Sequence, residues 1–131
     1  MTEFSWLARV YWEDTDGGGV VYYANYLKFL ERARTEWLRA RGLSQREIAT
    51  ASGILFTVVD LEIRYRKAAR LDDELRVTCK PRYEGRVTVW FDQQVLRDDE
   101  LLAEAAVRVA CVNASSFRPT AVPEFIAKEF R

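Results

Sequence analysis

The sequence contains no histidine among its 131 residues. This absence excludes Ser-His-Asp and Cys-His catalysis and every zinc site built on imidazole. The two cysteines, Cys79 and Cys111, cannot form an all-thiolate zinc site, so no metal site is expected. The glycine-rich motifs that bind nucleotide cofactors are also missing, and no cofactor is expected. Any catalysis must therefore rest on carboxylate, hydroxyl, guanidinium and backbone groups.

An excess of either charge is missing as well, because 20 basic residues balance 20 acidic ones. No global field favours nucleic acid or an anionic membrane, and no apolar run is long enough to span a bilayer. The N-terminal segment, residues 1–7, carries Glu3 and does not resemble a signal peptide. We therefore expect a cytoplasmic protein without membrane insertion and without a nucleic-acid partner. Cys79 and Cys111 then read as buried free thiols, since no CxxC motif occurs.

The N-terminal part combines a strand with a glycine turn. Residues 6–12 are rich in aromatic and β-branched side chains, which favours a strand. Residues 13–19, Glu-Asp-Thr-Asp-Gly-Gly-Gly, form an acidic turn. Consecutive glycines disfavour helix and strand and allow the backbone to approach a ligand closely.

A long amphipathic helix follows over residues 23–41. Apolar residues recur there at three- and four-residue spacing and form one stripe, and Gly42 is a stop signal. Ser44 is placed to cap a second, shorter helix through Thr50. The stripe consists of Tyr26, Phe29, Leu30, Ala33, Trp37 and Leu38.

Beyond Gly53 the apolar residues alternate with a period of two, which indicates strands. Residues 84–86 and 97–100 read as hairpin turns, and residues 124–130 form a short amphipathic tail. A lone helix needs a sheet face to bury its stripe. We therefore predict one α+β domain over residues 1–131, with a five-stranded antiparallel sheet wrapped around one long helix. The strand positions are Val59, Leu61, Ile63 and Tyr65; Leu75, Val77 and Cys79; Val87, Val89, Phe91 and Val95; and Ala103, Ala105, Val107, Val109 and Cys111.

Two segments resemble a known signature: residues 11–26, YWEDTDGGGVVYYANY, and residues 29–34, FLERAR. They are similar to the 4-hydroxybenzoyl-CoA-thioesterase-like hotdog family, and within it to the acyl-CoA thioesterases associated with the bacterial Tol–Pal system. The similarity continues through residues 69–73 and 103–112. It implies a hotdog fold and a homo-oligomer, dimer or tetramer, joined edge to edge. Each active site would combine the D-x-x-G turn of one subunit with surfaces of its neighbour.

The resemblance places Asp16 at the family's catalytic aspartate, acting as nucleophile or as general base on water. The alternative is that Asp16 only caps the turn. The backbone amide of Tyr23, at the positive end of the helix dipole, corresponds to the oxyanion donor. Many relatives carry histidine at position 23 and tyrosine at position 12, where this chain has Tyr23 and Trp12. Trp12 can pack against an acyl group but cannot act as an acid.

Further candidate contacts surround this turn. Asn25 could instead cap the helix, and Tyr22 could be a packing aromatic. Arg82 and Arg86 are candidates for the phosphates of coenzyme A, because arginine binds phosphate bidentately; each could equally be a solvating surface arginine. The candidate substrate-binding residues are Trp12, Gly19, Val20, Tyr22, Asn25 and Tyr26.

The sequence thus predicts an acyl-CoA thioesterase that releases a free carboxylic acid and coenzyme A. The missing histidine motivates the alternative, a non-catalytic hotdog protein that binds acyl-CoA or acyl-carrier protein. The aromatic residues near the turn suit aryl, phenacyl and short-to-medium aliphatic acyl groups alike, so the acyl group stays open at this point.

Overall fold

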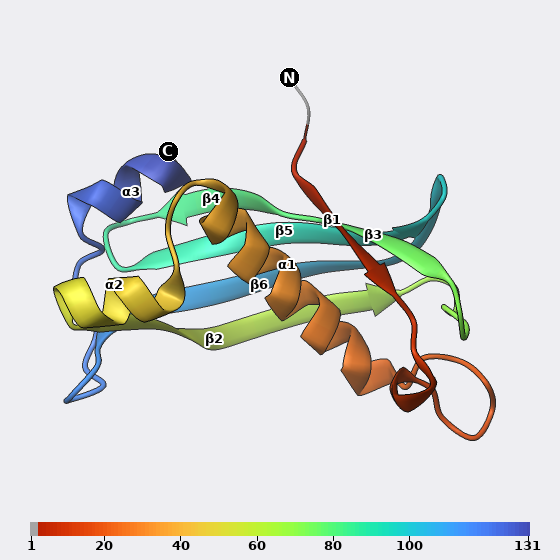
Figure 1. The fold of residues 1–131 in the computed structure, drawn as a ribbon. Coiled ribbons are helices and arrows are strands. Elements are labelled where there is room, and N and C mark those ends of the chain that lie inside the picture. Colours follow the sequence, from red (N-terminus) through yellow and green to blue (C-terminus); the bar gives the residue numbers. More distant parts are fainter. Residues whose placement is uncertain (1–2) are drawn as a thin grey trace.

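One long helix lies across an antiparallel sheet in the computed structural model, which describes residues 3–131 (Figure 1). Met1 and Thr2, part of the N-terminal segment considered above, lie outside the described residues. The helices are α1 (Tyr26–Ala40), α2 (Gln45–Ser52) and α3 (Glu124–Phe130), with 3₁₀ turns η1 (Trp12–Asp14) and η2 (Tyr23–Asn25). None of the helices in residues 3–131 has the length and apolarity needed to cross a bilayer.

The apolar stripe, the second helix and the C-terminal helix are confirmed. All six residues of the α1 stripe are buried. The Ser44 hydroxyl accepts the Glu47 N–H at 3.1 Å, and α2 continues to Ser52, two residues beyond the predicted end. It stops at Gly53, whose φ of 68° is left-handed and easily adopted only without a side chain. The amphipathic tail forms α3 and places Phe130 against Trp37, with ring centroids 5.7 Å apart.

The sheet has the order β1-β3-β5-β6-β2, and every pairing is antiparallel. A sixth strand, β4, follows β3 after one residue and also pairs with β5. The two predicted hairpin turns join β4 to β5 and β5 to β6. The strands are β1 (Ser5–Arg9), β2 (Ile54–Tyr65), β3 (Glu74–Thr78), β4 (Lys80–Glu84), β5 (Thr88–Arg97) and β6 (Glu100–Asn113).

Three strand predictions need correction. The first strand ends at Arg9, so residues 10–12 leave the sheet and Trp12 opens a 3₁₀ turn. β4 was missed because Pro81 and the charged residues around it hide its alternation; proline is tolerated there because β4 pairs with a strand on one side only. Val59 is the extra residue of a β-bulge, so Val58, not Val59, shares a face with Leu61.

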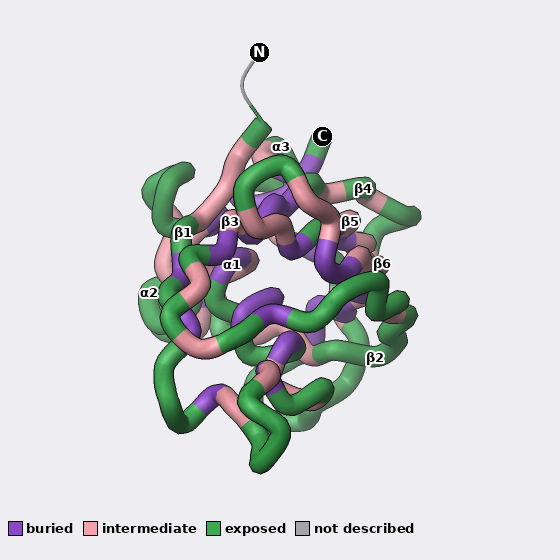
Figure 2. The backbone as a smooth tube through the Cα atoms, turned by 90° about the vertical axis from the view of Figure 1, so that its right-hand side faces the viewer, coloured by how far each residue is buried: buried purple, intermediate pink, exposed green. Residues whose placement is uncertain are grey.

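The two faces of the sheet differ in chemistry. One face packs on α1, and Figure 2 shows buried residues gathered between them. The other face carries charged and polar side chains, including Glu62, Arg64, Asp92 and Glu104. An antiparallel sheet wrapped around one apolar-striped helix is the predicted hotdog arrangement, which is confirmed.

Candidate active site

The loop that carries the candidate site is fixed by Asp14, which is 8% exposed. Its carboxylate accepts the Tyr11 N–H at 2.8 Å. Its carbonyl accepts the Tyr22 N–H at 3.0 Å and the Asn25 Nδ2–H at 3.0 Å. One buried residue therefore ties the end of the first strand to the start of the helix.

Asp16 lies two residues further on, at the base of the glycine turn, and is exposed. Backbone bonds close the turn: the Asp16 N–H donates to Val20 O at 2.9 Å, and Thr15 bridges to Val21. The Asp16 Oδ1 accepts the Gly18 N–H at 2.7 Å, and Gly19 has a left-handed φ of 81°. The carboxylate is therefore held by its own turn, and only Oδ1 is engaged among the described residues.

Within residues 3–131 the Tyr23 N–H has no hydrogen-bond acceptor, although the neighbouring backbone groups are paired. The Val21 N–H donates to Ala69 O, and the Tyr22 N–H donates to Asp14 O. The Tyr22 carbonyl accepts the Asn25 N–H at 2.8 Å. Since N–H and C=O of one trans peptide point in opposite directions, this bond turns the Tyr23 N–H away from the helix. An oriented, unpaired backbone donor thus follows the Asp16 turn.

The helix begins differently from the prediction. Residues 23–25 form a 3₁₀ turn and α1 starts at Tyr26, whereas one continuous helix was expected from residue 23. The Tyr65 hydroxyl on β2 donates to the Tyr23 carbonyl at 2.8 Å and holds this first turn. Burial, followed by the influence of Tyr26 and Tyr23, raises the pKa of Tyr65, so its hydroxyl stays protonated and able to donate.

The predicted substrate-contacting residues fall into two groups. Trp12, Tyr22 and Tyr23 are 79%, 45% and 62% exposed, and Gly19 is exposed with them; Val20 is partly exposed and bridges to Arg70. Tyr26 is instead 3% exposed, and its hydroxyl accepts the Ala69 N–H at 3.0 Å.

Asn25 also has a structural bond in the single chain. It occupies the N-cap position of α1, but its side chain makes no cap bond there and donates to Asp14 O instead. The capping alternative for Asn25 is therefore wrong.

Arg82 and Arg86 do not lie near Asp16 within one chain. They belong to the β4–β5 hairpin beside α3, whereas the Asp16 turn lies at the opposite end of the sheet (Figure 1). Arg82 already binds Asp92 bidentately, with two N–O distances of 3.0 Å, and Arg86 is exposed.

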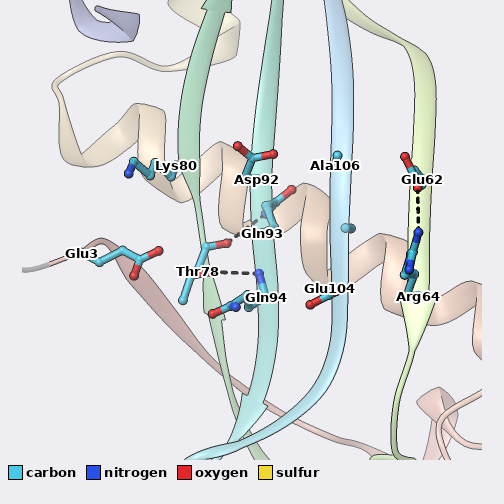
Figure 3. A pocket seen from close by; sticks show the side chains of 11 residues that line it. Glu3, Glu62, Arg64, Thr78, Lys80, Asp92, Gln93, Gln94, Glu104 and Ala106 are labelled. Atoms are coloured by element: carbon cyan, nitrogen blue, oxygen red, sulfur yellow. Dashed lines mark hydrogen bonds and ion pairs between the residues drawn. The ribbon is translucent and has the colours of Figure 1, made fainter.

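A hollow of about 470 Å³ lies on the charged face of the sheet, away from α1 (Figure 3). Its lining includes Glu62, Lys80 and Asp92 but neither Asp16 nor Tyr23. Polar groups that hydrogen-bond one another along the strands line it, so we do not place the active site there.

Neither a metal-ligand cluster nor a reactive thiol is seen in the described part of the chain. Within residues 3–131 no cluster of three metal-ligating side chains occurs. Burial raises the pKa of Cys79 to about 12 and that of Cys111 to about 11, which leaves both thiols protonated and poor nucleophiles near neutral pH. The reactive groups at the turn are therefore one carboxylate and one backbone amide.

Comparison with known proteins identifies the family. Residues 10–130 match the family model of the thioesterase-like superfamily. The chain belongs to that superfamily. The acyl-CoA thioesterase YbgC of Haemophilus influenzae is 42% identical over 127 residues, covering 97% of this chain and 93% of that one. The acyl-CoA thioester hydrolase YbgC of Escherichia coli O157:H7 is 41% identical, covering 99% and 97%.

Solved structures of this superfamily share the fold. A probable thioesterase from Bartonella henselae, 32% identical, superimposes with a TM-score of 0.87 over 93% of this chain and all of that one. A 1,4-dihydroxy-2-naphthoyl-CoA thioesterase from Synechocystis, 24% identical, gives a TM-score of 0.90 over 98% and 96% of the two chains.

Two residues of this site were not predicted. Asp14 stands in the same acidic segment as Asp16, and the sequence offers no signal for which of the two becomes buried. Tyr65 was assigned only to the apolar face of a strand, and its bond to Tyr23 joins positions 42 residues apart. Both roles depend on tertiary contacts.

Proposed function

We propose that this chain hydrolyses acyl-CoA thioesters to a free carboxylic acid and coenzyme A. The observation that carries the proposal is an exposed carboxylate, Asp16, followed by the Tyr23 N–H, which has no acceptor within residues 3–131. Thioester hydrolysis needs an activated oxygen and a donor for the carbonyl oxygen. These two groups supply both.

In the proposed reaction an oxygen nucleophile adds to the thioester carbonyl, and the Tyr23 N–H binds the oxygen that becomes negative. Loss of one such donor costs an enzyme about 3 kcal/mol of transition-state stabilisation. Collapse of the intermediate breaks the C–S bond and releases coenzyme A as the thiolate. Residues of the chain and water supply every step, so the proposal includes no metal and no cofactor.

Asp16 acts in one of two ways. As general base it removes a proton from water, whose oxygen enters the product acid. As nucleophile it forms an acyl-aspartyl anhydride, which water then hydrolyses. A single turnover in ¹⁸O-labelled water can reveal the anhydride. Label in the Asp16 carboxylate requires an anhydride that water opens at the aspartyl carbon, whereas label only in the released acid fits direct attack by water or opening of the anhydride at the acyl carbon.

The proposal includes a homodimer joined through β2. Among the described residues β2 pairs with β6 on one side only, and its exposed residues include Val58, Val59 and Leu61. A free edge with apolar side chains favours pairing with another strand. A twofold axis beside β2 exchanges the ends of the sheet, which brings the Asp16 turn of one chain to the Arg82 and Arg86 end of the other. In this arrangement the two arginines become available to coenzyme A phosphates, and such dimers can pair further into tetramers.

A thiol-release assay with a panel of acyl-CoA substrates tests the function. Release of free thiol is expected from at least one acyl class, and it should disappear in Asp16→Asn. Asp98→Asn is the matched control, since Asp98 occupies an exposed turn where asparagine tolerates the positive φ of 54°. Full turnover in Asp16→Asn would remove that carboxylate from the mechanism. Light scattering of the same samples measures the oligomer.

One observation favours a second function, binding without turnover. The Gly18 N–H already occupies Asp16 Oδ1, which is the bond expected if Asp16 only caps the turn. A protein of this kind would bind acyl-CoA or acyl-carrier protein and release no thiol from any substrate. Titration with coenzyme A, acyl-CoA and acyl-carrier protein, run beside the assay, distinguishes the two functions and the two carriers.

The cytoplasm is the compartment we propose. Cys79 and Cys111 are both free and buried, a state that a reducing compartment maintains.

A further inference from the structure

A second, smaller cavity lies between α1 and the sheet. Its volume is about 120 Å³. An apolar cavity of about 150 Å³ can hold a benzene molecule, so this smaller one fits a short acyl group but not a long fatty-acyl chain. The floor is apolar, and the mouth includes exposed residues of α1, α2 and β2. The lining residues are Glu31, Arg34, Leu38, Gln45, Phe56, Val58, Phe91, Val109 and Phe130.

Arg34 brings a positive charge into this apolar lining. It is half-buried, and burial lowers its pKa, although the thiol of Cys79 and the carboxylate of Glu31 act in the opposite direction. Its one hydrogen bond within residues 3–131 runs from Nη1 to Gln93 Oε1 at 3.1 Å. No carboxylate of the described residues forms an ion pair with it. A guanidinium has five N–H donors, so most of them are available to a ligand in the cavity.

Gln93 fixes the position of this guanidinium. It is 2% exposed, and its Nε2 donates to Leu30 O at 3.0 Å and to Thr78 O at 3.3 Å. Gln93 and Thr78 are labelled in Figure 3. These two bonds leave Oε1 as the acceptor and direct it toward Arg34. The arginine is therefore held in place by the core of the protein, which reduces the entropy that ligand binding would cost.

The cavity and the Asp16 turn lie at opposite ends of one chain. Phe56 marks the cavity end of β2, and Tyr65, bonded to Tyr23, marks the other. The strand rises by nine residue steps from Phe56 to Tyr65, which is a distance of about 30 Å. A short acyl group cannot connect these points within one chain. In the proposed β2-paired dimer, however, the partner's Asp16 turn comes to the cavity end.

We propose that this cavity receives the acyl group of the substrate and that Arg34 selects acyl groups ending in a carboxylate. The inference rests on the function proposed above. The planar fork of arginine matches a carboxylate with two parallel bonds, and such bonds are strong in a partly apolar cavity. Glu31 opposes an anionic ligand, but it lies exposed at the mouth and is engaged by the Thr35 hydroxyl at 2.7 Å, where solvent screens its charge.

The test compares two substrates of the same shape, glutaryl-CoA and its neutral isostere 5-methylhexanoyl-CoA. We expect kcat/KM to favour glutaryl-CoA by about tenfold to a hundredfold, the range for charge-assisted hydrogen bonds. Arg34→Met should abolish that preference by lowering the value for glutaryl-CoA only. Arg34→Lys should restore part of it, and Glu31→Gln should increase it. Arg32→Met is the control, because Arg32 is an exposed residue of the same helix outside this lining.

The outcomes separate the two proposals. If the isostere is hydrolysed but glutaryl-CoA is not preferred, or if Arg34→Met lowers both values equally, the selectivity inference is wrong and the thioesterase proposal stands. If neither substrate nor any other acyl-CoA is hydrolysed, the proposed function fails. Titration of both compounds into the wild-type protein then still decides whether Arg34 selects the carboxylate: equal affinities would overturn the inference.

Discussion

Asp14 and Asp16 stand two residues apart, yet their surroundings differ in almost every respect. Asp14 is buried, and its carboxylate and carbonyl bind groups from both flanking segments. Asp16 is exposed and accepts one N–H from its own turn. One aspartate therefore holds the loop in shape, and we propose that the other is available for chemistry. Four substitutions test this division.

The largest effect is expected for Asp16→Asn. Loss of a general base or nucleophile should lower kcat by about 10²- to 10⁴-fold. Thermal unfolding should be unchanged, because an amide oxygen can still accept the Gly18 N–H. Calorimetry beside the thiol-release assay measures both quantities. A large fall in melting temperature would show that Asp16 also supports the loop.

For Asp14→Ala we expect a loss of stability rather than a direct loss of catalysis. The Tyr11 N–H loses its acceptor in a partly buried site, which should cost about 1–3 kcal/mol in the free energy of unfolding. Activity should fall only as far as the loop loses its shape. Asp14→Asn, which keeps an acceptor oxygen, should recover most of the stability in urea unfolding. Equal stability of the alanine variant and the wild type would contradict the anchoring role.

A smaller loss is expected for Asn25→Ala. This change removes one hydrogen bond to Asp14 O, which keeps its second donor, the Tyr22 N–H. The expected destabilisation is about 0.5–1.5 kcal/mol, measured by chemical denaturation. If Asn25 contacts substrate as well, KM should rise beyond what the stability loss explains, and the size of that rise tests its predicted binding role.

The smallest effect is expected for Gly18→Ala. A Cβ there would lie 3.2 Å from Asp16 Oδ1, so the carboxylate must shift by a few tenths of an ångström. We expect kcat to fall about two- to fivefold, with stability changed by less than about 0.5 kcal/mol. Gly17→Ala is a matched control, since a Cβ there meets nothing within 4 Å. Equal rates in the two variants would show that the exact place of the carboxylate is unimportant.

Much of the fold could be predicted from periodicity, because an apolar stripe can be read from the local sequence. The α1 stripe and the hairpin turns have this character. Proline and charge hid β4, and the bulge at Val59 cannot be seen without the partner strand β6. Two-residue periodicity alone gives no sign of an inserted residue.

The site was predictable to a smaller degree. The glycine turn and its aspartate can be read from the sequence, and the resemblance gave them a role. The burial of Asp14, the orientation of the Tyr23 amide and the joining of Arg34 to Gln93 depend on residues far apart in the chain. Such contacts arise only after the helix has packed on the sheet.

The bond from Tyr65 to the Tyr23 carbonyl has a consequence for the behaviour of the protein in dilute solution. Tyr65 belongs to the edge strand β2. In the proposed dimer this strand would contact a second chain and also stabilise the peptide that follows Tyr23. Dissociation would then remove a neighbour and loosen the catalytic loop at once. Specific activity should decline when the enzyme is diluted below the dissociation constant of the dimer, and Tyr65→Phe should make that decline begin at higher protein concentration.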